Sequence, residues 1–75
     1  MNYTIEQQKD FILNKVIEKR KLSFTQIVEY NHEKIGVIYN FLAILELLQL
    51  QQIKISMGDG YNNFWIERLE KELVD

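Results

Sequence analysis

The stretch Ile35–Leu50, IGVIYNFLAILELLQL, decides the fold of this chain. Twelve of its sixteen residues are apolar, and it contains no proline that would interrupt a helix. Its apolar residues recur three and four positions apart rather than at alternate positions, so the stretch predicts a helix. A helix that is apolar on nearly every side must also be covered on nearly every side.

One broad apolar arc of this helix is expected to face the core. At about 100° per residue, the arc consists of Val37, Ile38, Phe41, Ile44, Leu45 and Leu48. The apolar residues outside the arc are Ile35, Tyr39, Leu42, Ala43, Leu47 and Leu50. A chain of 75 residues is too short to cover both sides. We therefore expect an exposed apolar patch, the kind of surface that marks a protein interface.

The length of the chain predicts a single domain, residues 1–75, with one small core. Residues 3–66 are expected to form that core, and residues 67–75, which carry opposed charges, a solvated tail or a short helix. The absence of cysteine excludes disulfides and thiolate zinc sites. The polar start MNYTIEQQKD is no secretory signal, and the apolar stretch is too short to span a bilayer. We expect a cytoplasmic protein that makes no membrane contact.

Two helix starts precede the long helix. Thr4 is followed three residues later by Gln7, and Ser23 by Gln26, which is the spacing of a capping box. Asn31 is expected to cap the long helix. The first helix should present one apolar stripe and then a solvated basic end; the stripe is Ile5, Ile12, Leu13, Val16 and Ile17, and the basic end is Lys19, Arg20 and Lys21.

A hairpin follows the long helix. Ile53–Met57 alternates apolar and polar residues, Gly58, Asp59 and Gly60 favour a turn, and Phe64–Ile66 is the returning strand, with Trp65 on the face opposite its neighbours. The order helix, short helix, long helix, hairpin predicts a small α+β winged helix-turn-helix. Its antiparallel wing would have two strands, or three.

Catalysis has little support in these residues. His32 is the single histidine, and it lies in a turn without a cysteine or a second histidine nearby. The glycines near Asp59 lie between strands rather than before a helix, so they do not form a phosphate loop. We expect no enzyme, no cofactor and no metal.

Binding to DNA is the usual function of a winged helix, but positive charge is scarce where it would be needed. The long helix offers Asn40, Glu46 and Gln49, and the hairpin offers Lys54 against Asp59. Affinity for DNA comes mainly from neutralised phosphates. A small DNA-binding transcriptional regulator nevertheless stays open as the alternative, as does self-association.

Partner binding through the surplus apolar surface is the leading interpretation. The expected contact residues lie on the outer side of the long helix and on the outward face of the returning strand. They are Tyr39, Leu42, Ala43, Glu46, Leu47 and Trp65. The first helix could wrap far enough to bury some of them, Leu42 and Tyr39 in particular.

The residues also resemble a known family. The run Phe41–Leu47, FLAILEL, followed by the returning strand Phe64–Ile66, is similar to the C-terminal domain of segregation and condensation protein A, the bacterial kleisin. The similarity continues upstream through Lys21–Phe24 to the helix start at Thr4.

The resemblance implies a winged-helix domain that acts in chromosome condensation and segregation by docking on the ATPase head of a structural-maintenance-of-chromosomes protein. It also implies no catalysis and no direct contact with nucleic acid. In the full-length protein it implies a second segregation and condensation protein as a further partner. The chain would then be the C-terminal fragment of a longer protein.

Overall fold

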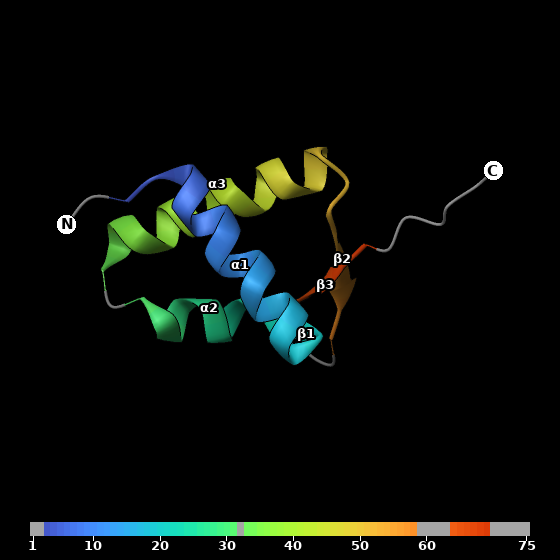
Figure 1. Cartoon of the computed structure of the whole chain (residues 1–75). Helices are drawn as coiled ribbons and strands as arrows, with labels where there is room; N and C mark the ends of the chain where they lie inside the picture. Colours follow the sequence, from blue (N-terminus) through green and yellow to red (C-terminus); the bar gives the residue numbers. More distant parts are fainter. Residues whose placement is uncertain (1–2, 32, 59–63, 70–75) are drawn as a thin grey trace.

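The structure, a computed structural model, describes residues 3–31, 33–58 and 64–69. These residues form three helices, and Figure 1 shows the sheet at one end of them. The elements are α1 (Ile5–Lys19), β1 (Lys21–Ser23), α2 (Phe24–Tyr30), α3 (Lys34–Gln49), β2 (Ile53–Met57) and β3 (Phe64–Arg68). This order confirms the α+β winged helix-turn-helix, in which α2 and α3 form the helix pair and β2 and β3 the wing.

The first two helices begin where the sequence predicts. The side chain of Thr4 accepts a hydrogen bond of 3.0 Å from the backbone N–H of Gln7. At the start of α2 the full capping box is present, because Ser23 accepts from the backbone of Gln26 and donates its own backbone N–H to the Gln26 side chain. These contacts satisfy backbone N–H groups that a helix start leaves unpaired.

The cap predicted for α3 is wrong. Asn31 ends α2 instead, and its side-chain amide donates a 3.0 Å hydrogen bond to the carbonyl of Ile27, one turn back. Glu33 precedes α3 without a side-chain capping hydrogen bond. The side chain of Asn31 is thus hydrogen-bonded to the end of the preceding helix. The last carbonyl groups of a helix lack partners within it, just as the first N–H groups do. The expectation for His32 lies outside the described residues.

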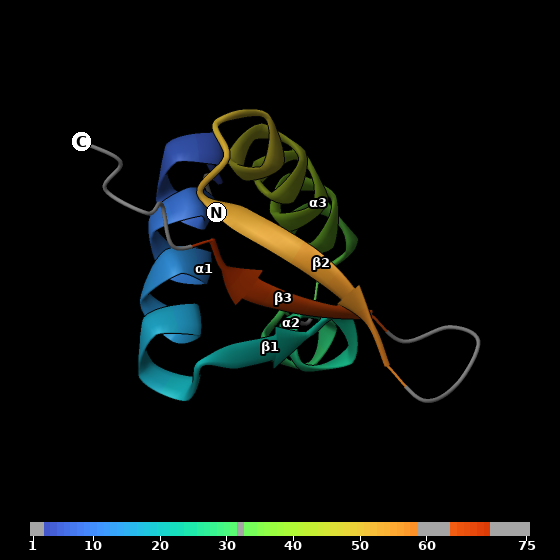
Figure 2. The ribbon, with the colours of Figure 1, turned by 90° about the vertical axis from the view of Figure 1, so that its right-hand side faces the viewer.

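The sheet has three strands in the order β1-β3-β2, all antiparallel. Figure 2 looks onto it and shows β3 between the two edge strands. Leu22, Ile66 and Ile55 lie opposite one another across the three strands. The segment Lys21–Ser23 is therefore an edge strand and supplies the third strand that the sequence left open.

The last strand is longer than expected. It includes Glu67 and Arg68, so these two residues belong to the sheet and not to a tail or helix. The turn residues 59–63 and the tail residues 70–75 lie outside the part of the chain that the structure describes.

All six elements contribute to the core. Ile17 was expected in the apolar stripe of α1, but its side chain is 57% exposed, because the buried side of that helix is centred on Ile12 and Val16. Ile5 and Leu13 pack against the core from its border. The buried apolar residues are Ile12, Val16, Leu22, Ile27, Ala43, Ile44, Leu47, Ile53 and Ile66.

Candidate functional site

The side of α3 that faces away from the core carries large apolar side chains from Ile35 to Leu45. We call it the outer face of α3; it consists of Ile35, Ile38, Phe41, Leu42 and Leu45, all of them exposed. Successive members are separated by three residues, or by one in the case of Phe41 and Leu42, and this spacing places them on one side of a helix. Ile38 is 53% exposed and Leu45 48%. Large apolar side chains gathered in this way on a helix are unusual unless a partner covers them.

The structure reverses much of the predicted orientation of α3. Ile38, Phe41 and Leu45 were expected in the core and are exposed. Ala43 and Leu47 were expected at the surface and are fully buried. The expected exposure of Ala43 and Leu47 is therefore wrong. The exposure expected for Leu42 is confirmed.

The remaining members of the core arc follow the same rotation. Ile44 is buried as expected, while Val37 and Leu48 are half-buried at the border of the core. Tyr39 is half-buried too, because its ring stacks on the ring of Tyr3 at 6.2 Å between centroids. It therefore lies at the edge of the outer face, beside the N-terminal end of α1.

The physical reason for this rotation is the close approach of α1 to α3. The buried side of α3 carries Gly36, Asn40, Ala43, Ile44 and Leu47, of which Gly36 and Ala43 are small. A Cβ atom on Gly36 would lie 3.0 Å from ring carbons of Tyr3, a residue that precedes α1. Small side chains allow two helices to approach closely, which brings more of their atoms into van der Waals contact.

A buried hydrogen bond holds this arrangement. The side-chain amide of Gln8 in α1 donates to the side-chain oxygen of Asn40 at 2.9 Å, and Asn40 is fully buried. The Asn40 amide nitrogen has no partner among the described residues. Sequence reasoning placed Asn40 on the polar side and so missed this contact. The signal available was the spacing of Gly36, Asn40, Ala43 and Leu47 along one stripe.

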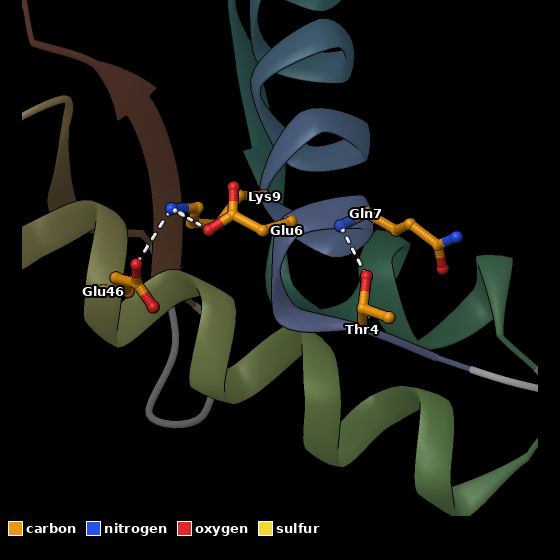
Figure 3. A network of polar contacts seen from close by, with 5 residues as sticks. All are labelled: Thr4, Glu6, Gln7, Lys9 and Glu46. Atoms are coloured by element: carbon orange, nitrogen blue, oxygen red, sulfur yellow. Dashed lines mark hydrogen bonds and ion pairs between the residues drawn. The ribbon is translucent and has the colours of Figure 1, made fainter.

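Glu46, expected to meet a partner, forms a contact within the domain instead (Figure 3). The ammonium group of Lys9 in α1 lies 2.9 Å from a carboxylate oxygen of Glu46 and 2.9 Å from one of Glu6. The pKa of Lys9 is raised above its ordinary value of 10.5, mainly by the hydrogen bond to Glu46 and to a smaller extent by the one to Glu6. Glu46 therefore joins α1 to α3 at the flank of the outer face.

Trp65 does not share a face with Leu42. It alternates with the buried Ile66 along β3, so it projects from the sheet surface that faces away from the helices. Its side chain is half-buried, and the ammonium group of Lys21 lies 5.4 Å from the centre of its ring. The predicted set of six residues is thus divided among the core, the flank and two separate surfaces.

The described residues contain no group of three or more His, Cys, Asp and Glu side chains placed to hold a metal ion. Within that same part of the chain, no helix has the length and apolar character needed to cross a membrane.

Comparison with known proteins finds relatives that share one name. The chain is 30% identical to segregation and condensation protein A of Clostridium tetani over 73 residues. These residues make up 97% of this chain and 29% of the relative. The protein of the same name from Clostridium acetobutylicum is 33% identical over 67 residues, 89% of this chain and 27% of that protein. The resemblance to segregation and condensation protein A is confirmed.

The same likeness extends to a more distant source. Segregation and condensation protein A of Macrococcus caseolyticus is 27% identical over 66 residues, which cover 88% of this chain and 28% of the relative. The chain therefore spans less than a third of the length of these curated relatives. No protein-family model and no solved structure matches the chain.

Proposed function

We propose that this chain is a non-enzymatic docking domain that acts in chromosome segregation and condensation, equivalent to the C-terminal domain of segregation and condensation protein A. Its partner in this proposal is the ATPase head of a structural-maintenance-of-chromosomes protein. The observation that carries the proposal is the outer face of α3, a continuous row of exposed large apolar side chains. The second segregation and condensation protein that the resemblance implies would bind elsewhere in a full-length protein.

The character of this face favours a protein partner over DNA. A helix that reads the major groove presents Arg, Lys, Asn or Gln to the base edges, and cations nearby hold the phosphates. The outer face of α3 presents five apolar side chains, and Asn40, which could have read a base, is fully buried. Apolar side chains that are desolvated at the centre of an interface supply much of the affinity of a protein complex.

The test is binding of the purified domain to a recombinant ATPase head, measured by calorimetry. Replacing Leu45 or Ile38 by glutamate should raise the dissociation constant at least about thirtyfold, because burying an unpaired charge in a desolvated contact is costly. Both side chains are about half exposed, so the folded domain should tolerate either change.

The matched control is Val28→Glu. It places the same charge at an exposed aliphatic residue, but on α2 and outside the outer face of α3. Its affinity for the head should equal that of the unaltered domain. Full-strength head binding by the Ile38→Glu and Leu45→Glu variants together would show that another surface docks. If light scattering shows that the domain alone has twice its monomer mass, and Leu45→Glu abolishes this doubling, the outer face would instead be assigned to self-association.

A further inference from the structure

A second surface of the domain is basic, and the proposed docking function does not use it. A pocket lies between the C-terminal half of α1 and the ends of β2 and β3. Figure 2 shows the C-terminal end of β3 directed towards α1 at this place. Arg20, Lys54 and Arg68 line the pocket, each from a different part of the chain. All three are exposed at the surface.

These cations have no anionic partner in the described part of the chain. The ion pairs found there involve Lys9 and Lys15, and none involves the three cations of the pocket. Glu67 also lines the pocket, and one of its carboxylate oxygens accepts a 3.0 Å hydrogen bond from the hydroxyl of Ser56. The four charged side chains therefore leave an excess of positive charge in one depression, on a domain whose formal net charge is −2.

The backbone at Arg20 supports a role for its side chain. Its φ angle is 69° and its ψ angle −39°, a conformation that side chains disfavour and glycine adopts readily. Arginine at this position therefore costs stability, and the cation that it adds lines the pocket.

We propose that this pocket binds an acidic peptide segment of a partner protein that also carries apolar residues. Charge complementarity selects the acidic residues. The apolar residues are selected by the aliphatic side chains of Val16, Ile17 and Leu69, which line the pocket beside the cations. Ile17 is the most exposed of the apolar side chains of α1. A ligand with apolar groups would cover this side chain and remove its surface from water, which favours binding.

A nucleic acid fits this pocket less well for three reasons. Three cations would release about three counterions, a small number for a DNA-binding surface. A phosphodiester backbone gains little from an exposed isoleucine. Glu67 would repel phosphates, and the backbone of DNA offers it no hydrogen-bond donor, whereas a peptide offers its N–H groups.

The experiment is a fluorescence anisotropy titration of the domain with a labelled short peptide in which glutamate and leucine alternate. The matched probe replaces every glutamate by glutamine. The acidic peptide should bind, its affinity should fall as salt rises from about 50 to 200 mM because the charges lie near the surface, and the glutamine peptide should bind at least about tenfold more weakly.

Variants of the three cations locate the site. Lys54→Gln and Arg68→Gln should each weaken binding of the acidic peptide about two- to fivefold, and the two together with Arg20→Gly about tenfold or more. Lys34→Gln, a neutralised cation on α3 away from the pocket, should leave the affinity unchanged. Arg20→Gly separates binding from folding, because it should weaken peptide binding while the melting temperature stays the same or rises.

Three results would overturn the proposal. Equal binding of the two peptides would show that charge does not select the ligand, and retention of acidic-peptide binding by the triple variant would place the site elsewhere. Binding of a labelled DNA duplex that the triple variant loses, with no binding of the peptide, would make the pocket a phosphate site. None of these results bears on head docking by the outer face of α3, which Leu45→Glu tests independently.

Discussion

The two sides of α3 differ in a way that hydrophobicity alone does not predict. The inner side carries Gly36, Asn40 and Ala43 and is buried, whereas the outer side carries Ile38, Phe41 and Leu45 and is exposed. The inner side also holds the large residues Ile44 and Leu47, but only on the outer side are large apolar side chains left in contact with water. Which side of a helix enters the core depends on how closely its neighbour can approach, and surplus apolar surface then remains for a partner.

The largest effect is expected when a leucine is truncated on each side of α3 and the losses of stability are compared. Leu47→Ala removes a fully buried side chain and should lower the free energy of unfolding by about 2–5 kcal/mol. Leu45→Ala makes the same chemical change on the outer side and should alter it by less than about 1 kcal/mol. Urea denaturation followed by circular dichroism measures both. Equal losses would mean that the two sides are packed alike.

The buried hydrogen bond between α1 and α3 should have the next largest effect. Asn40→Ala removes the acceptor of the Gln8 amide and leaves that amide buried without a partner, which should cost about 1–3 kcal/mol. Replacing Gln8 and Asn40 together by leucine should recover most of this loss, because neither position then holds a polar group. A double-mutant cycle on urea midpoints measures the coupling. Additive single effects would argue against the hydrogen bond.

A smaller effect is expected at Gly36, where the approach of the chain before α1 is closest. Glycine to alanine inside a helix ordinarily gains about 1 kcal/mol. Here the new Cβ atom would lie 3.0 Å from the ring of Tyr3 and from the side-chain oxygen of Asn31, so that the gain should be absent or reversed. Thermal melts of Gly36→Ala, alone and combined with Tyr3→Ala, test this. A full gain with Tyr3 intact would show that the contact is loose.

The smallest effect concerns the flank between the two sides. Hydrogen bonds to Glu46 and Glu6 raise the pKa of Lys9, so the folded state favours the protonated amine. The resulting stabilisation is complete below the ordinary value of 10.5 and is lost as pH rises through the higher folded value. The melting temperature should therefore fall more between pH 9 and strongly alkaline pH in the unaltered domain than in Lys9→Met. Thermal melts of both proteins across this pH range test the prediction, and an equal fall in the two would contradict it.

The sequence allowed the elements to be predicted better than their orientation. The capping boxes at Thr4 and Ser23 and the alternation of Ile53–Met57 are local signals, and they place the helix starts and the wing because neighbouring residues alone determine them. The edge strand at Lys21 was missed because three residues with one apolar side chain carry too weak a pattern. Its partner, β3, lies more than forty residues further along the chain.

The buried side of α3 was assigned wrongly for a different reason. A helix with so few polar residues has no polar stripe to mark its solvent side, and one of those residues, Asn40, is buried. The candidate site changed with that assignment. Leu42 stays on the exposed face, Ala43 and Leu47 move into the core, and Glu46 pairs with Lys9. Of the other residues of the outer face, Ile38, Phe41 and Leu45 had been placed in the core, whereas Ile35 had been placed outside it.

The place of β3 in the sheet has a consequence for how the domain comes to be folded. It is the middle strand and also the last of the described strands, so both edge strands lack a hydrogen-bonding neighbour until it has been synthesised. Its pairing with β1 spans most of the described chain, and such distant pairings form late and slowly. A chain synthesised only as far as residue 63 lacks the strand that joins β1 to β2, so the sheet can form only after residues 64–68 have been added.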